Sequence, residues 1–235
     1  MAKGDKKLKK LSDADKVKEL KRRLKKLKAQ AAPVADASAV QPVPQKAAPK
    51  VSPLAPARFP DLPVIEGVEF ASGAAGVKYK GRTDVTLIRI APGAAIAGAF
   101  TRSATRAASV LDCQAKLAAG ADMQGGAAIV VNSGNANAFT GAAVQASVDA
   151  VTQAAAHALD VPQSRVFSSS TGVIGEPLPH ERITAILGDL AGKLDARGIA
   201  GAARAIMTTD TFPKGASATV EGQGGPIRIA GLAKG

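Results

Sequence analysis

Hydroxyl and glycine residues cluster in residues 168–176, SSSTGVIGE, between an apolar run and a proline-rich stretch. The glycines are similar to those of a phosphate-binding loop, but its Gly-Lys-Ser/Thr ending is missing, which disfavours a nucleotide site. A turn that leaves a strand and directs backbone amides and a threonine hydroxyl into a cleft could instead stabilise the oxyanion of an acyl transfer. The residues alone leave this chemistry open beside an ordinary strand-to-helix turn, and they favour the ordinary turn.

Two further polar segments could contribute to a site. Residues 132–138, NSGNANA, place three asparagines directly after an apolar run. Asparagine tolerates left-handed backbone and bonds neighbouring amides, so a structured turn and a turn that binds a polar ligand are equally compatible with this segment. Residues 207–214, MTTDTFPK, combine hydroxyls with one carboxylate, which could cap a helix or line a pocket. The types of these residues alone do not indicate a particular function.

The cysteine and histidine content argues against several other chemistries. His157 lies in an alanine-rich stretch, where a core or surface imidazole is a better interpretation than a catalytic base, and Cys113 is interpreted as a small packed hydrophobe. One cysteine cannot form an internal disulfide or a cysteine zinc cluster, and two histidines, the other being His180, are too few for a histidine-rich metal site. We therefore expect no metal and a reducing, cytoplasmic location.

The net charge of +12 is concentrated near the N-terminus. Residues 1–60 hold 16 of the 31 basic and 5 of the 19 acidic residues and so carry +11, which leaves +1 for residues 61–235. The basic character belongs to a tail, and aromatic residues make up only 3% of the chain, so nucleic-acid binding is not expected. The apolar runs are far too short to cross a bilayer, and no signal peptide is evident, so no membrane is expected either.

Residues 1–30 are predicted to form a basic amphipathic helical tail. Ser12 resembles a helix cap, and apolar residues then recur at helical spacing, at Val17, Leu20, Leu24 and Leu27. The tail could contact an acidic partner, RNA or a membrane surface, but its apolar stripe lacks aromatics, which favours a solubilising or assembly role. Residues 31–61 are rich in alanine and proline and are expected to be a disordered linker.

Residues 62–235 are expected to form the folded domain. Strands are predicted at 68–70, 77–79, 85–90, 127–131, 166–167 and 227–232, with a further short apolar run at 107–111. Helices are predicted at 141–159, 179–194 and 199–206. Strands that precede and alternate with helices predict a layered α/β or α+β domain.

Together and in this order, these segments resemble the glutamate N-acetyltransferase, or ornithine acetyltransferase, family of arginine biosynthesis. The resemblance covers about residues 62–235. The matching segments are 76–82 (GVKYKGR) with Asp84, 97–102 (AGAFTR), 132–138, 170–179 (STGVIGEPLP), 207–214 and 231–235 (GLAKG). Several separate motifs in register make the match more specific than any single glycine pattern.

The resemblance implies an α/β fold akin to the N-terminal nucleophile hydrolases and a precursor that cuts itself autocatalytically into two chains, assembled as an α2β2 heterotetramer. The β chain then begins with a threonine whose free amine can act as base for its own hydroxyl. The present chain would be the α-chain portion of an acyltransferase. It would move acetyl from N2-acetylornithine to glutamate by a ping-pong mechanism, through an acetyl-threonine intermediate. Acetyl-CoA could also serve as a substrate, as in multifunctional members; no other cofactor, metal or nucleotide is expected.

The resemblance also assigns the site residues. Thr171 and Gly172 would form the oxyanion hole. Thr208 and Lys234 would bind substrate, and the Lys234 ammonium could pair with an amino-acid carboxylate. The register within MTTDT leaves the choice between Thr208 and Thr209 open.

Two departures from the family pattern bear on activity. The nucleophilic threonine is expected about ten residues beyond Gly235, so the chain is expected to be inactive without its β chain. Residues 1–60 have no counterpart in the pattern, and the resemblance assigns them no role. Two other functions stay open: a related self-processing aminopeptidase, and a non-catalytic binding protein whose basic tail recruits RNA or an acidic partner.

Overall fold

The structure, a computed structural model, describes residues 15, 17, 18, 21, 22, 25, 26, 51–120 and 122–234. The chain divides into two compact units, Met1–Ala48 and Pro49–Gly235. In the first unit the described residues are helical and exposed. The rest of the predicted tail helix, and residues 31–50 of the predicted linker, lie outside the described residues, so both stay predictions.

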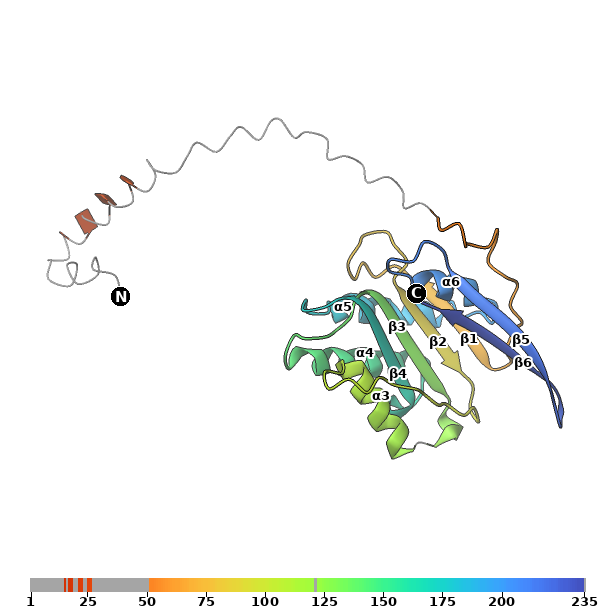
Figure 1. The fold of residues 1–235 in the computed structure, drawn as a ribbon. Helices are drawn as coiled ribbons and strands as arrows, with labels where there is room; N and C mark the ends of the chain where they lie inside the picture. Colours follow the sequence, from red (N-terminus) through yellow and green to blue (C-terminus); the bar gives the residue numbers. More distant parts are fainter. Residues whose placement is uncertain are drawn as a thin grey trace. The chain divides into compact units, whose positions relative to one another are not determined.

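A four-stranded mixed sheet forms the centre of the second unit (Figure 1). Its strands lie in the order β1 (Val68–Gly73), β2 (Val85–Ile90), β3 (Ala127–Asn135) and β4 (Val166–Val173). β1, β2 and β3 pair antiparallel, whereas β3 and β4 pair parallel. The parallel pair places the carboxyl ends of β3 and β4 side by side. A separate hairpin is formed by β5 (Lys214–Gly222) and β6 (Gly225–Ala233).

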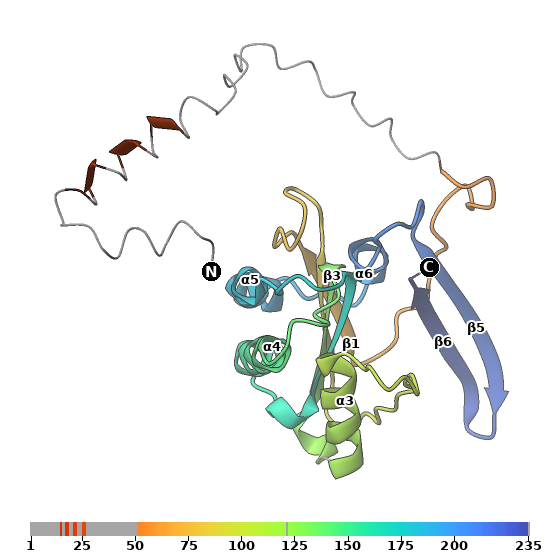
Figure 2. The same cartoon turned by 60° about the vertical axis from the view of Figure 1, so that its left-hand side comes forward.

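Helices α4 (Ala143–Leu159) and α5 (His180–Ala191) cover one face of the sheet (Figure 2). Leu87 and Val130 of the sheet belong to the same buried cluster as Val151 of α4. Helix α5 adds residues three or four positions apart, which therefore share one face of the helix: Ile183, Leu187 and Leu190. This cluster is the hydrophobic core.

Helix α6 (Ile199–Ala205) lies on the opposite face and contacts β1 and β2 (Figure 2). Its small residues allow a close approach, since a Cβ at Gly201 would lie 3.2 Å from Ser72 Oγ. Ser133 Oγ donates to the carbonyl of Ala205 at 2.7 Å and ties the helix end to β3. Helix α3 (Ala108–Ala119) contacts β4 and α4, and two short 3₁₀ turns, Met123–Gly125 and Gln163–Arg165, precede β3 and β4.

Most predicted elements are found, and the α/β class is confirmed, but one predicted strand is absent and two elements, α3 and β5, were not predicted. The predicted strand 77–79 is a bend, because the amides of Ala75 and Val77 donate to the Asp84 carboxylate instead of a neighbouring strand. The apolar run 107–111 opens helix α3, and β5 was not predicted because its largely exposed residues show no apolar alternation. Among the described helices, none has both the length and the apolar character needed to span a bilayer.

Candidate functional site

The segment SSSTGVIGE is mostly strand, which corrects the predicted turn. Residues 168–173 belong to β4, whose backbone pairs with β3 along its length. The polar side chains fit this pairing, because Ser170 Oγ donates to Asn132 Oδ1 at 2.6 Å across the two strands. The chain leaves the sheet only after Val173.

Glycines bring β3 and β4 very close at their carboxyl ends. Gly134 and Gly172 have φ angles of 100° and 140°, which side-chain-bearing residues rarely adopt. A Cβ on Gly172 would lie 2.2 Å from the carbonyl carbon of Gly134 and 2.5 Å from the nitrogen of Asn135. The strand register is irregular between Gly134 and Asn135. Irregularities of this kind, called β-bulges, change the direction of backbone groups and often occur beside active sites.

The three asparagines of residues 132–138 are buried and bonded within the protein: Asn132 lies within β3, Asn135 ends it and Asn137 follows it. The side-chain amide of Asn132 donates to the carbonyl of Asn135 at 2.9 Å. Asn135 donates to the carbonyl of Glu176 at 3.0 Å, and Asn137 to that of Val144 at 3.0 Å. The bonds favour a structural role over ligand binding, but residues 132–135 belong to β3, which corrects the predicted turn for this part of the segment.

A cavity of about 290 Å³ lies at this end of the β3–β4 pair. All four residues assigned by the resemblance line it: Thr171, Gly172, Thr208 and Lys234. They come from β4, from the segment between α6 and β5, and from the residue after β6. The remaining lining residues are Tyr79, Arg82, Gly134, Val173 and Thr209. The fold therefore joins segments that are far apart in the sequence.

The cavity is positively charged. Arg82 and Lys234 are the ionised side chains among the described residues that line it, and both are cationic. Hydroxyls of Tyr79 and of the threonines add neutral hydrogen-bonding groups. This set of side chains suits a ligand that carries a carboxylate.

Tyr79 and Arg82 reach the cavity on the segment between β1 and β2. Asp84 is only 3% exposed, and its carboxylate accepts the amides of Ala75 at 2.7 Å and Val77 at 2.6 Å, which folds this segment back on itself. The types of Tyr79 and Arg82 did not mark them as site residues. The one available signal was their place in the matching segment 76–82.

Thr208 and Thr209 both line the cavity but differ in how they are held. Thr208 is half-buried, and its amide donates to Asp210 Oδ2 at 3.0 Å. The Asp210 side chain is fully buried, and Lys214 Nζ lies 2.5 Å from its Oδ1. Thr209 is exposed. The arrangement gives Thr208 the better defined position.

The remaining titratable residues that the sequence singled out lie elsewhere. His157 is exposed, and His180 Nδ1 lies 3.1 Å from Ser147 Oγ. Cys113 is buried, and its thiol donates to the carbonyl of Ser168 at 3.4 Å. Burial raises the pKa of the Cys113 thiol and keeps it neutral, as expected for a packed, unreactive residue. In the part of the chain that the structure describes, no three His, Cys, Asp or Glu residues are grouped to hold a metal ion.

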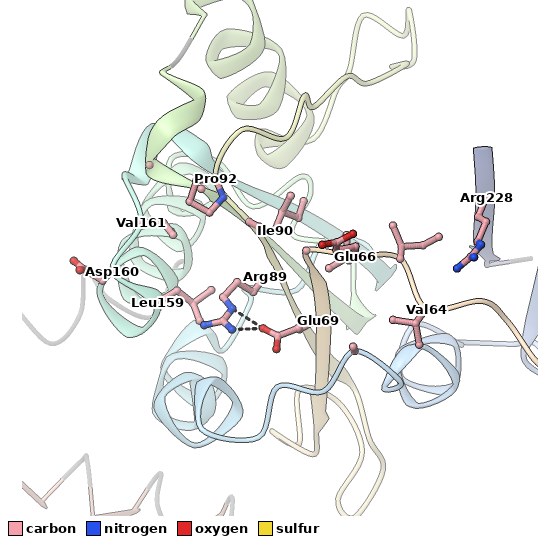
Figure 3. A pocket seen from close by; sticks show the side chains of 17 residues that line it. Val64, Glu66, Glu69, Arg89, Ile90, Pro92, Leu159, Asp160, Val161 and Arg228 are labelled. Atoms are coloured by element: carbon pink, nitrogen blue, oxygen red, sulfur yellow. Dashed lines mark hydrogen bonds and ion pairs between the residues drawn. The ribbon is translucent and has the colours of Figure 1, made fainter. Parts of the chain in front are cut away.

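A larger cavity of about 750 Å³ lies apart from the four assigned residues (Figure 3). Glu69 and Arg89 face each other there across the β1–β2 register and form an ion pair, with Arg89 Nε 2.7 Å from Glu69 Oε2. The opposite charges of Glu69 and Arg89 compensate each other. No hydroxyl, amide or imidazole side chain occurs among the described residues that line this cavity. The smaller cavity is therefore the better candidate for chemistry.

Comparison with known proteins identifies relatives of the whole folded unit. Residues 69–235 match the ArgJ family. Over 186 residues the chain is 64% identical to the arginine biosynthesis bifunctional protein ArgJ of Ruegeria pomeroyi, an alignment that covers 79% of this chain and 45% of the relative. The protein of the same name from Bradyrhizobium diazoefficiens is 49% identical over 185 residues, with 79% and 44% covered. The chain thus spans less than half the length of these curated relatives.

Solved structures share the fold. The arginine biosynthesis bifunctional protein ArgJ of Bacillus halodurans superposes with a TM-score of 0.64 at 30% identity, covering 72% of this chain and 87% of that one. An ornithine acetyltransferase from Mycobacterium tuberculosis, complexed with ornithine, gives 0.63 at 34% identity, with 72% and 89% covered. The resemblance seen in the sequence is confirmed, and the chain belongs to the ArgJ family.

Proposed function

We propose that this chain is the α-chain portion of an acyltransferase that moves acetyl from N2-acetylornithine to glutamate in arginine biosynthesis. The observation that carries the proposal is the cavity of about 290 Å³, where Thr171, Gly172 and Thr208 meet Lys234 although they lie in separate segments. Membership of the ArgJ family supports the pathway. The similarity to an ornithine acetyltransferase complexed with ornithine supports the substrate class.

Thr171 and Gly172 stabilise the oxyanion in this proposal. When a nucleophile attacks the acetyl carbonyl, negative charge develops on its oxygen, and preorganised donors lower the barrier most effectively there. The φ angle of 140° at Gly172 and the irregular register opposite it turn peptide groups away from a regular ladder. This geometry supports a role for backbone amides at the strand end.

Lys234 and Thr208 bind the amino-acid part of the substrate. Both N2-acetylornithine and glutamate carry an α-carboxylate, which the Lys234 ammonium can pair with. The positive charge of the cavity supports this assignment. Thr208 is the better candidate than Thr209 because its amide is bonded to Asp210, whereas Thr209 is exposed.

The nucleophile is supplied by the β chain of the same precursor, in an α2β2 assembly. The terminal amine of its first residue, a threonine, takes the hydroxyl proton as the oxygen attacks the acetyl carbon. The carbon–nitrogen bond to ornithine then breaks, ornithine leaves with a proton on its amine, and acetyl stays on the threonine. The glutamate amine attacks this ester, which releases N-acetylglutamate and restores the threonine hydroxyl.

Co-expression with the coding segment that follows this chain tests the proposal. Intact mass spectrometry should show two chains, and the second should gain the mass of one acetyl group after N2-acetylornithine is added. Glutamate should remove that group, and a parallel sample with acetyl-CoA tests the second acetyl donor. Peptide cleavage without acetyl transfer would favour the aminopeptidase instead, and a product with neither activity would favour the binding protein.

A threonine variant tests the oxyanion assignment in the same assay. Thr171→Ala removes the hydroxyl donor and keeps the backbone amides, and it should lower the rate of acetyl transfer by about 100- to 1,000-fold, the usual effect of losing one oxyanion donor. Thr184→Ala is a matched control, because Thr184 is half-buried on α5 outside the cavity and its hydroxyl donates to the nearby carbonyl of Glu181. Equal rates for Thr171→Ala and the unmodified enzyme would exclude the Thr171 hydroxyl as an oxyanion donor.

A further inference from the structure

Arg82 links the cavity wall to the segment that carries Thr208. Its guanidinium is half-buried, and Nη2 donates to the carbonyl of Met207 and, at 3.3 Å, to that of Thr208. Arg82 also lines the cavity itself. Because Thr208 lies 126 positions away in the sequence, only the tertiary structure creates this contact.

Thr208 is consequently held at both of its peptide groups. Its N–H donates to Asp210, and its carbonyl accepts from Arg82. Asp210 is held in turn by Lys214. With both peptides fixed, rotation about the Thr208 side-chain bond is the main freedom left to its hydroxyl, and that bond prefers a few staggered positions.

We propose that Arg82 is a positioning residue that holds the Thr208 peptide so that its hydroxyl meets the substrate. The inference rests on the proposed function, in which Thr208 contacts the substrate. A guanidinium suits this role because it is planar, keeps its charge at any physiological pH and presents several donors in a fixed geometry. Small displacements of positioning groups can cost a large part of the rate.

The segment that carries Arg82 is itself held in place by other residues. The buried Asp84 carboxylate holds the amides of Ala75 and Val77, on the same segment as Arg82. Lys78, on that segment, also pairs with Glu176, just beyond β4, at 2.6 Å. The position of Thr208 therefore depends on the segment between β1 and β2, which contributes the guanidinium.

A double-mutant cycle in the co-expressed two-chain enzyme tests the proposal. Thr208→Val and Arg82→Ala should each raise KM for N2-acetylornithine about tenfold, the usual effect of losing a hydrogen bond to a charged ligand. If Arg82 acts through Thr208, the double variant should also show about a tenfold increase, because the second change removes nothing further. Arg58→Ala is the control, since Arg58 is 83% exposed and pairs only with Asp61.

Two results would overturn the proposal. If the increases in KM caused by Arg82→Ala and Thr208→Val multiply in the double variant, Arg82 acts independently of Thr208. Full recovery of KM in Arg82→Lys would show that charge alone suffices, because lysine keeps the charge but lacks the planar fork.

Amide hydrogen exchange of the full chain provides a readout that does not depend on activity. Arg82→Ala should speed exchange in residues 207–214, and Arg58→Ala should not, because only the first change releases the Met207 and Thr208 carbonyls. Unchanged exchange in Arg82→Ala would overturn the proposal. If the unmodified enzyme transfers no acetyl, the proposed function fails, while this measurement still decides the role of Arg82.

Discussion

Replacing Gly172 by alanine tests the close approach of β3 and β4 at the cavity. Gly172 has a φ angle of 140°, and a Cβ there would lie 2.2 Å from the carbonyl carbon of Gly134 and 2.5 Å from the nitrogen of Asn135. Both are backbone atoms, which cannot rotate away as the end of a flexible side chain can. One of the two strands must therefore move.

The expected loss of stability has two sources. A side chain in this backbone region costs about 1–3 kcal/mol. Forcing an added methyl group into packed surroundings costs about 1–3 kcal/mol more. We therefore expect the free energy of unfolding to fall by about 2–6 kcal/mol, a large part of the roughly 5–15 kcal/mol typical of a domain.

Substitutions of two other glycines separate the cost of backbone strain from the cost of the steric clash. Gly175 has a φ angle of 82°, but nothing lies within 4 Å of the position of a Cβ, so Gly175→Ala should cost only about 1–2 kcal/mol of backbone strain. Gly188 lies within helix α5 with the same open space. Gly188→Ala should raise the free energy of unfolding by about 0.5–1 kcal/mol, because alanine is the better helix former.

Urea unfolding of the full chain, followed by circular dichroism, measures all three variants. Gly172→Ala should lose at least about 1 kcal/mol more than Gly175→Ala, since only the former adds the clash with β3. Equal losses would refute the reasoning, because they would mean that β3 and β4 leave room for a methyl group at the cavity.

The remaining predictions concern one buried carboxylate and the buried thiol. Asp84→Asn should lower the free energy of unfolding by about 2 kcal/mol, because an amide replaces one of two acceptors for the N–H groups of Ala75 and Val77. The same urea assay on Asp61→Asn, whose side chain is 90% exposed, should show a change within about 0.5 kcal/mol, and similar losses in both variants would contradict the anchoring role. Burial raises the pKa of Cys113 in the folded protein, so the neutral thiol is favoured by folding. Its stabilising contribution is fully present below the unfolded pKa of about 8.5 and is lost as pH rises through the higher folded pKa. Cys113→Ala should therefore reduce the fall in unfolding free energy above pH about 9, and identical pH profiles would contradict this sign.

Strongly periodic segments could be predicted from the sequence. Ile183, Leu187 and Leu190 recur at helical spacing, and α5 is the helix they predict. Residues 85–90 alternate, and they form β2 as predicted. The residues that share a buried face are three or four positions apart in the helix and two apart in the strand. The pattern that predicts each element is therefore local in the sequence.

Polar strands could not be predicted in this way. Residues 168–173 have the hydroxyls and glycine of a turn, yet they form β4 because β3 supplies hydrogen-bond partners from far along the chain. Residues 77–79 have the types of a strand but bend because Asp84 takes the nearby amides. Both errors arise where a hydrogen-bond partner that residue types do not reveal satisfies the backbone, a distant strand in the first case and the Asp84 side chain, seven and nine positions away, in the second.

The sequence by itself determined the family, the layered α/β class and the residue types capable of acyl transfer, because these depend on motifs and on short-range periodicity. Only the tertiary structure decided that Thr171, Gly172, Thr208 and Lys234 share one cavity. It also decided that Arg82 holds the Thr208 peptide. The physical reason is that the distances between these residues are set by contacts between segments far apart in the sequence, which no local pattern encodes: the pairing of β3 with β4, the β5–β6 hairpin and the bond from Arg82 to Thr208.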